Sequence, residues 1–325
     1  MSSLVRAAAN TRAQEFETIR VAVAGSVNMD LVAQCDRLPR PGQTVHAVAY
    51  SQLPGGKGAN QAVAAARLGA ECAIIGRIGD DAFGERLAAT LAQYGVATDG
   101  LLSTPNTSSG LAWINVDQTG ENSITMVPGA NSQVSPEDVR NNATLIESAN
   151  VLVVQLEIPL DTVLAAIKIA SAAGVMTILD PAPALTGQMP DELFRVDVMT
   201  PNQTEAEALT GVSVTDVQSA VRACKRLRDR GVPRPVITLG ADGAVFLDEC
   251  TEVPRHALPP RVEVVDTTAA GDAFTAALAC RLAAGRTLAA AVSFGCAAGA
   301  LAATALGAQN VMPEWNDVME VEKRV

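Results

Sequence analysis

The chain has 325 residues, of which 48% are hydrophobic and 18% are charged, and its formal net charge is −11 at pH 7. This balance predicts a large buried core and argues against a disordered chain. The acidic charge argues against a nucleic-acid partner or an anionic membrane surface, so an anionic ligand must be held by local dipoles.

Short apolar runs rich in β-branched residues alternate with Ala-rich stretches along most of the chain. Near-continuous apolar strands that alternate with helices are typical of a parallel sheet covered on both faces. A helix is expected over 58–69, ending at Gly69, and another follows Asp80-Asp81. We therefore predict an α/β fold with a mainly parallel central sheet, whose strands lie at 19–25, 72–76, 151–157, 175–180, 196–200 and 235–240.

Two regions, 31–53 and 107–127, break this rhythm, because polar and apolar residues alternate there in short segments such as "LAWINVD" and "SITMV". Such alternation predicts antiparallel strands with one exposed face. We expect these strands to form one small sheet outside the main domain, a lid that keeps water from reactive phosphates. The alternative is that they are edge strands of the main sheet.

Two segments bear on targeting. Residues 1–19 lack the apolar core of a secretory signal and are weakly similar to a transit peptide, and we expect a disordered tail before a domain over 20–325. Residues 287–308 form a charge-free run long enough to span a bilayer. Because this run is mostly Ala, Gly and Ser, it predicts a soluble helix packed closely on the sheet, and no membrane partner is expected.

The cysteines and histidines argue against several kinds of site. The six cysteines show no CxxC spacing, which favours free thiols in a reducing compartment over disulfides or zinc. We therefore expect a cytoplasmic protein, with an organelle left open. His46 and His256 are the only histidines, and neither has a ligand-like neighbour. This argues against a His-based metal site and against a Ser-His-Asp hydrolase.

Polar motifs stand where predicted strands end, which is where open parallel sheets bind ligands. Asn28 and Asp30 follow the first strand and could bind sugar hydroxyls, although turn-forming Asn and Asp occur in any loop. The segment "PGGKGAN" (54–60) departs from the Walker A pattern at its first glycine and at its final Ser/Thr position. The glycines around Lys57 either allow the backbone to approach a small ligand or simply begin a helix.

Three further motifs offer polar groups. Glu157 closes an apolar strand, where it is either functional or merely exposed at the strand tip. Asn202 and Glu205 lie three residues apart at a helix start, where they form either a capping box or an acidic position that organises Mg²⁺ through water. The segment "TLGADG" (238–243) ends a strand and predicts a hairpin turn whose backbone could contact a nucleotide.

The segment "VVDTTAAGDAF" (264–274) places a small-residue turn before an Ala-rich helix. The N–H groups of Ala269, Ala270 and Gly271 and the helix dipole favour a phosphate there, yet Asp272 adds a negative side chain. Phosphoryl transfer to an alcohol needs both, because the amides stabilise the migrating group and a carboxylate accepts the hydroxyl proton. The alternative role for Asp272 is that of a first-turn residue complementing the helix dipole.

Together these motifs resemble those of the ribokinase-like family of sugar and nucleoside kinases, from about residue 20 to about residue 315. The resemblance rests on "GSVNMD", "GGKGANQAVAAARLGA", "GDDAFG", "QLEIP", "DPAPA", "TPNQTEAE", "TLGADG", "DTTAAGD" and "GAQ". It implies a three-layer α/β/α sandwich with a mainly parallel central sheet and a small antiparallel β lid. "GGKGAN" and the preceding Asn-x-Asp are similar to the ribose-specific branch, which implies ATP-dependent phosphorylation of D-ribose at its 5-hydroxyl.

The resemblance also implies roles for individual residues. Asp272 would be the general base, and the backbone amides of 269–272 would form an anion hole. The sugar would be held by Asn28, Met29, Asp30, Gly56, Lys57, Gly58, Ala59, Asn60 and Glu157. ATP and its Mg²⁺ would be bound by Asn202, Glu205, Thr238, Leu239, Gly240, Ala241, Asp242, Gly243, Gly271, Asp272 and Cys296. A monovalent cation, typically K⁺, would be bound by Asp266, Thr268, Ala302, Ala305 and Gly307, with Val311 at a further family position.

Some features of the resemblance bear on specificity and assembly. Val311 cannot donate a side-chain oxygen to K⁺, and Cys296 stands where a His or Asn often lies near the adenine. In the family the lid sheets of two subunits pair, which implies a homodimer. The alternatives are a kinase for another small sugar such as deoxyribose or fructose, a nucleoside kinase, and a non-catalytic sugar sensor. The absence of an aromatic residue among the pocket residues disfavours the nucleoside kinase.

Overall fold

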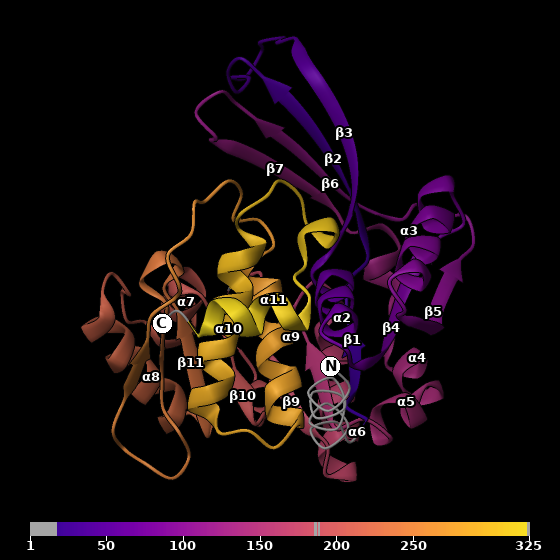
Figure 1. Cartoon of the computed structure of the whole chain (residues 1–325). Coiled ribbons are helices and arrows are strands. Elements are labelled where there is room, and N and C mark those ends of the chain that lie inside the picture. Colours follow the sequence, from indigo (N-terminus) through magenta and orange to yellow (C-terminus); the bar gives the residue numbers. More distant parts are fainter. Residues whose placement is uncertain (1–17, 185–186, 188, 324–325) are drawn as a thin grey trace, which may run out of the picture.

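The computed structural model describes residues 18–184, 187 and 189–323, and a nine-stranded sheet forms its centre (Figure 1). Neighbouring strands are parallel except at one edge, where β11–β12 and β12–β13 are antiparallel. The mainly parallel sheet predicted from the sequence is thus confirmed. The strands, in sheet order, are β13 (Arg255–Ala257), β12 (Ala244–Phe246), β11 (Arg234–Thr238), β10 (Val198–Met199), β9 (Met176–Leu179), β8 (Val151–Val154), β1 (Arg20–Ala24), β4 (Glu71–Gly79) and β5 (Ala97–Thr104).

Helices cover both faces of this sheet. In β1, Val21 and Val23 belong to one buried cluster, whereas Ala22 and Ala24 belong to another. Because successive strand side chains point to opposite faces, both faces are buried and the fold is a three-layer α/β/α sandwich. The first cluster includes residues of α2 (Lys57–Arg67), α3 (Ala82–Gln93), α9 (Ala270–Ala283), α10 (Leu288–Ala302) and α11 (Trp315–Glu322). The second includes residues of α4 (Pro136–Asn141), α5 (Ala143–Glu147), α6 (Leu160–Ala173), α7 (Gln203–Thr210) and α8 (Val217–Asp229).

A separate four-stranded sheet stands above the carboxyl ends of the central strands (Figure 1). We call it the lid sheet; its order is β3 (Ala47–Gly55), β2 (Asn28–Cys35), β6 (Gly110–Val116) and β7 (Asn122–Val127). It is not an edge of the main sheet. The β2–β3 and β6–β7 pairs are antiparallel, as expected, but β2–β6 is parallel, so the sheet is mixed. The reason is that β2 and β6 belong to different hairpins and leave the main domain side by side, with Asn28 paired to Gly110.

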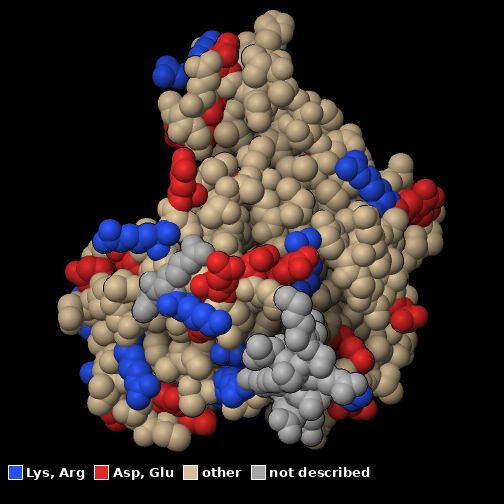
Figure 2. Space-filling model, viewed as in Figure 1, with Lys and Arg blue, Asp and Glu red and all other residues tan. Residues whose placement is uncertain are grey.

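The register of the lid sheet places several apolar residues on the same face as Asp30. Asp30 pairs with Ala112, which pairs with Met126, and two residues further along Ile114 pairs with Ile124. Met126 is 44% exposed and Ile124 is 52% exposed. Most of the lid surface visible in Figure 2 carries no charge, and its charged side chains gather near the tip. The lid therefore presents apolar surface that the described part of the chain leaves exposed.

The terminal and Ala-rich segments differ partly from expectation. Residues 1–17 of the predicted tail lie outside the described residues, but Ile19 is buried and its carbonyl accepts the N–H of Glu71, so the packed domain begins before residue 20. The charge-free run contains α10, which packs on α9. At Gly295 a Cβ would lie 2.9 Å from the Phe274 ring, so the glycine allows this close approach. Among the described residues no helix is long and apolar enough to cross a bilayer, and all six cysteines are free thiols, as predicted.

Candidate active site

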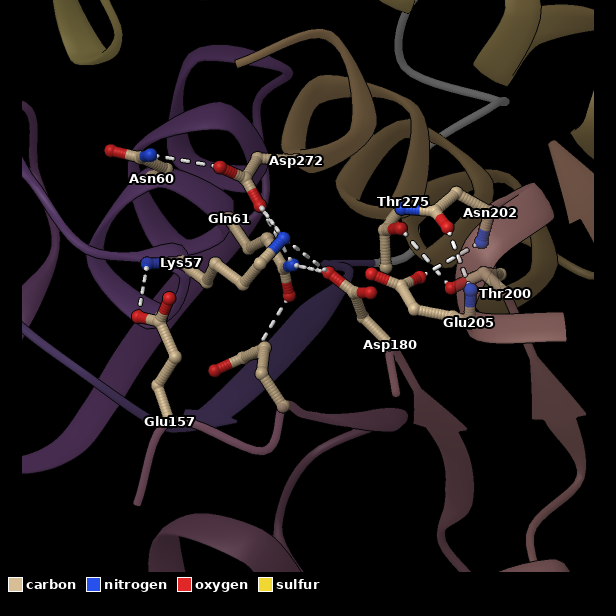
Figure 3. Close-up of polar contacts among 12 residues, drawn as sticks. Lys57, Asn60, Gln61, Glu157, Asp180, Thr200, Asn202, Glu205, Asp272 and Thr275 are labelled. Carbon is tan, nitrogen blue, oxygen red and sulfur yellow. Dashed lines mark hydrogen bonds and ion pairs between the residues drawn. The ribbon is translucent and has the colours of Figure 1, made fainter. Parts of the chain in front are cut away.

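The polar motifs meet at the carboxyl ends of neighbouring central strands. Strands β1, β8, β9, β10 and β11 lie side by side in the sheet, and the chain leaving four of them carries Asn28, Glu157, Asp180 and Asn202. The amino ends of α2 and α9 face the same region, with α9 contributing Asp272 (Figure 3). Ligands bind at this edge in open α/β sheets, so the topology itself assembles the candidate site.

Asp272 is held on both carboxylate oxygens by amides from α2. Its side chain is almost fully buried, with 3% relative exposure of the residue. Asn60 Nδ2 donates to Oδ2 at 2.8 Å, and Gln61 Nε2 donates to Oδ1 at 3.0 Å (Figure 3). The ammonium nitrogen of Lys57 lies 3.9 Å from Oδ1. Asp272 thus adjoins the residues of the "PGGKGAN" motif, as a base acting on a bound sugar requires.

The surroundings of Asp272 adjust its basicity. Burial raises its pKa to about 6, and the nearby carboxylate of Asp180 raises it too, whereas Lys57 and the amides of Asn60 and Gln61 lower it. A carboxylate with this pKa is mostly deprotonated at neutral pH and is a stronger proton acceptor than an ordinary aspartate.

One of the N–H groups predicted to form the anion hole makes a hydrogen bond within the folded chain. Helix α9 begins at Ala270, with Ala269 as its N-cap. The N–H of Ala270 donates to the carbonyl of Thr267 at 3.2 Å, so it is engaged within the turn. Within the described chain the N–H groups of Gly271 and Asp272 have no backbone acceptor, as first-turn N–H groups of a helix commonly do not. A Cβ placed on Gly271 would meet no atom within 4 Å, so the space beside Gly271 is open.

Asp30 lies within electrostatic range of this base, and Asn28 stands two residues before Asp30 in β2. Asn28 is 2% exposed, and its Oδ1 accepts a hydrogen bond from Asn131 Nδ2 at 2.6 Å, which fixes the orientation of the amide. Burial raises the pKa of Asp30 to about 7, and the carboxylates of Glu157 and Asp272 contribute to the rise. A cluster of buried carboxylates of this kind is typical of functional sites rather than of stable cores.

Glu157 lies three residues beyond the end of β8, so the prediction that it closes this strand was wrong, and its side chain is partly buried. Its Oε2 accepts hydrogen bonds from Ser26 Oγ at 2.5 Å and from the backbone N–H of Lys57 at 3.3 Å, so it lies at the amino end of α2, where the dipole favours a negative charge. A Cβ on Gly58 would lie 2.6 Å from backbone atoms of Gly25 and Ser26, so this glycine allows α2 to pack closely on the turn after β1.

The other sugar-side residues offer different groups. Met29 and Ala59 are fully buried in the core, so their side chains face packing rather than a ligand. Gly56 adopts a φ of 89°, a conformation that favours glycine. Asn60 Oδ1 is buried and lacks a hydrogen-bond partner among the described residues. A buried acceptor without a partner is costly, and a ligand hydroxyl would satisfy it.

On the nucleotide side, Asn202 and Glu205 form the capping box that was one of the two alternatives. Glu205 N–H donates to Asn202 Oδ1 at 2.9 Å, and Asn202 N–H donates to Glu205 Oε2 at 2.8 Å. Burial and the neighbouring Asp180 raise the pKa of Glu205. The cap occupies only Oε2, so the other oxygen of this carboxylate fits a Mg²⁺ ion held through water.

The 238–243 segment forms the predicted hairpin. It joins β11 to antiparallel β12 through a short 3-10 turn at Gly240–Asp242, whose residues are exposed, whereas Leu239 and Gly243 are buried. Thr238 pairs with Asn202, which brings this turn beside the capping box. Cys296, by contrast, is buried in the core cluster, and burial raises the pKa of its thiol to about 12. It therefore offers no reactive group at the surface.

Two segments predicted to bind a monovalent cation lie against each other. Asp266 accepts the N–H of Gly307 at 3.1 Å through Oδ2, and the N–H of Thr268 at 3.0 Å through Oδ1. Ala302 is buried and Ala305 is exposed. Val311 packs against the core, so its side chain has an apolar role. The carboxylate of Asp266 and the backbone carbonyls of the adjoining loops are oxygen donors of the kind that hard cations prefer.

Comparison with known proteins identifies the family. The sequence model of the pfkB family carbohydrate kinases matches residues 18–315. The chain belongs to this family. A ribokinase of Haemophilus influenzae is 42% identical over 299 residues, which cover 92% of this chain and 96% of that protein. A deoxyribokinase of Salmonella typhi is 38% identical over 254 residues, covering 78% of this chain and 82% of that protein.

Solved structures agree with this assignment. The structure of Arabidopsis thaliana ribokinase complexed with ribose and ATP has a TM-score of 0.88 and 33% identity, covering 94% of this chain and 99% of that chain. The resemblance inferred from the motifs and the ribokinase-like fold are therefore confirmed.

Sequence reasoning missed several residues of this pfkB-family site. Asp180 lies in the quoted "DPAPA" motif without an assigned role, yet its Oδ2 is 3.5 Å from Lys57 Nζ and accepts from Gln61 Nε2 at 2.8 Å. Lys57 was expected to hold the sugar, but its ammonium group lies between Asp180 and Asp272 (Figure 3). Burial lowers the pKa of Lys57, but the surrounding carboxylates outweigh it and raise the pKa overall, so the ammonium stays charged. A carboxylate directly after a buried strand was the available signal for Asp180.

Proposed function

We propose that the protein transfers the γ-phosphoryl group of ATP to the 5-hydroxyl of D-ribose, giving D-ribose 5-phosphate and ADP. The observation that carries this proposal is the place of Asp272, which joins the sugar-side residues of α2 to the open N–H groups at the start of α9. The similarity to a ribokinase complexed with ribose and ATP supports the same substrates.

In the proposed reaction, Asp272 accepts the proton of the 5-hydroxyl as that oxygen forms a bond to the γ-phosphorus and the bond to the β-phosphate oxygen breaks. The N–H groups of Gly271 and Asp272 stabilise the charge on the migrating group. Lys57 keeps the acidic cluster compatible with an approaching anion, since its ammonium offsets the charges of Asp180 and Asp272. Asn28, Asp30 and Asn60 are the proposed sugar ligands.

Two ions complete the proposal. Asn202 and Glu205 would hold Mg²⁺ through water beside the 238–243 hairpin, and the ion would neutralise phosphate charge. The loops of Asp266 and Gly307 would hold K⁺ next to the start of α9, where a fixed positive charge reinforces an anion site.

The lid sheet supports the proposals of a closing lid and a homodimer. Ile124 and Met126 are exposed apolar residues on the face that carries Asp30, so pairing two lids would bury them. Replacing Ile124 with Glu should therefore convert a dimer to a monomer in light scattering, whereas Glu121→Gln, at an exposed turn, should not.

We also infer a reducing compartment such as the cytoplasm, because the six thiols are free.

A sugar panel with measured ADP release tests the function. We expect kcat/KM to be greatest for D-ribose, and phosphorus NMR to place the new phosphate on the 5-oxygen. The 38% identity to a deoxyribokinase makes 2-deoxyribose the second candidate, which the same panel ranks against ribose. ADP release with neither pentose, from folded protein, would refute the proposal.

A further inference from the structure

Two glutamines lie buried behind the candidate base without any role in the reaction described above. Gln61 is in α2 and is 1% exposed, and Gln155 follows β8 and is 0% exposed. Burying a long amide costs free energy unless its hydrogen bonds are made, and an apolar residue of similar shape would avoid that cost. Their presence therefore needs a reason other than packing.

The hydrogen bonds between these residues have a defined direction. Gln155 Nε2 donates to Gln61 Oε1 at 2.6 Å. Gln61 Nε2 in turn donates to Asp272 Oδ1 at 3.0 Å and to Asp180 Oδ2 at 2.8 Å (Figure 3). Ionised carboxylates can only accept, so the amide nitrogen of Gln61 must face them and its oxygen must face Gln155. The amide nitrogen of Gln155 thereby fixes which end of Gln61 meets the base.

We propose that Gln155 and Gln61 form a relay of buried amides that positions the carboxylate of Asp272 for its part in the reaction. This inference rests on the proposed function. Gln61 donates a hydrogen bond to Asp272 Oδ1 and Asn60 donates one to Asp272 Oδ2, so rotation of the carboxylate would break one bond or the other. Gln155 does not contact Asp272, and it acts only through the orientation of Gln61.

The backbone at Gly25 leaves room for the side chain of Gln155. A Cβ on Gly25 would lie 1.9 Å from Gln155 Oε1, so a residue with a side chain there would displace Gln155. Gln155 Oε1 is itself buried and has no hydrogen-bond partner among the residues that the structure describes. A residue selected for stability alone would not leave an acceptor unpaired, which favours a positioning role.

The charged groups that face Asp272 are Lys57, Asp180 and Asp30. Lys57 lowers the pKa of Asp272, whereas Asp180 raises it, and Asp272 in turn raises the pKa of Asp30. Gln61 lowers it by donating to the ionised form. Loss of this donor should therefore move the acid limb of the kcat profile to higher pH, which a residue that serves only packing would not do.

Gln155→Glu is the sharpest test, because it should reverse the orientation of the Gln61 amide. The ionised carboxylate can only accept, so it would accept from Gln61 Nε2 and turn Gln61 Oε1 toward Asp272 and Asp180. The comparison is made on the alkaline side of the pH profile, because a protonated carboxyl would still donate to Gln61 Oε1. We expect kcat for D-ribose to fall about 30-fold, KM to stay within about threefold, and the acid limb to rise by about one pH unit. Gln155→Met is the matched control, since it removes the anchor without reversing Gln61, and kcat should fall less than about fivefold.

Gln61→Leu separates the relay from the charge that Gln155→Glu adds, and keeps the test decisive if that variant does not fold. It removes the donor without adding charge, and should lower kcat about tenfold and raise the acid limb. An unshifted pH profile in folded Gln61→Leu, or equal losses in Gln155→Met and Gln155→Glu, would overturn the relay. Wild-type turnover of D-ribose, measured alongside, distinguishes this failure from failure of the proposed function.

Discussion

Replacing Asp272 with Asn should lower activity and preserve or increase stability in the same protein. The residue is buried, and its pKa is raised from 3.8 to about 6. At neutral pH the folded protein therefore bears the cost of an ionised carboxyl that its surroundings disfavour, a difference of about two pKa units or about 3 kcal/mol. Asparagine has nearly the same shape and removes this charge.

The stability that Asp272→Asn gains by removing this charge is offset by one mismatched hydrogen bond. Asn60 and Gln61 both donate to Asp272, and an asparagine amide presents one oxygen and one NH₂ group to these two donors. Such a donor–donor contact costs about 1–3 kcal/mol. We therefore expect the free energy of unfolding of Asp272→Asn at neutral pH to lie between the wild-type value and about 2 kcal/mol above it.

The pH dependence of stability gives a second signature. Between about pH 4 and about pH 6 the folded state keeps the proton that the unfolded state has lost. This group's contribution to stability therefore falls as the pH rises through that window, and the cost persists at higher pH. Asp272→Asn should lack this component, so its advantage over wild type should grow from about pH 4 to about pH 7 in urea titrations.

Activity should change in the opposite direction. Removing the general base should lower kcat about a hundred-fold or more, with ribose binding largely retained in calorimetry. The reasoning is refuted if the folded variant turns over within about threefold of wild type, or if it is less stable than wild type throughout the window.

Three further outcomes follow from the geometry. After desalting, K⁺ should activate turnover more than Na⁺, and Asp266→Ala should abolish the difference; equal rates in wild type would contradict the cation site. Gly58→Ala should lower kcat/KM for ribose about a hundred-fold, because the new Cβ would lie 2.6 Å from the backbone of the β1–β2 turn and displace it. Near-normal kinetics would contradict this, since they would show that the turn relaxes without disturbing the site. Arg77→Met should lower the free energy of unfolding by about 3 kcal/mol without changing kcat/KM, since it removes the ion-pair partner of the buried Asp138 carboxylate. Adding Asp138→Asn should restore part of the loss.

The sequence by itself determined the features that depend on local pattern. Apolar strands alternating with Ala-rich helices predicted the parallel sheet, because a strand buried on both faces must be apolar throughout. The turn before Asp272 and the glycines around Lys57 indicated candidate ligand positions, because backbone approach and exposed N–H groups need small residues at fixed positions.

Only the tertiary structure decided which distant groups meet. Gln61 and Gln155 carry no local signal, since a glutamine in a helix or after a strand is ordinary until its partners are known. The place of Asp180 directly after a strand gives a local signal, but it does not reveal which residues Asp180 meets. The parallel β2–β6 pair depends likewise on where two hairpins leave the domain. The hydrogen bond of Ala270 to Thr267 depends on the folded geometry of its turn. Sequence patterns report periodicity and backbone freedom, whereas pKa values and hydrogen-bond direction depend on neighbours that only the packed chain brings together.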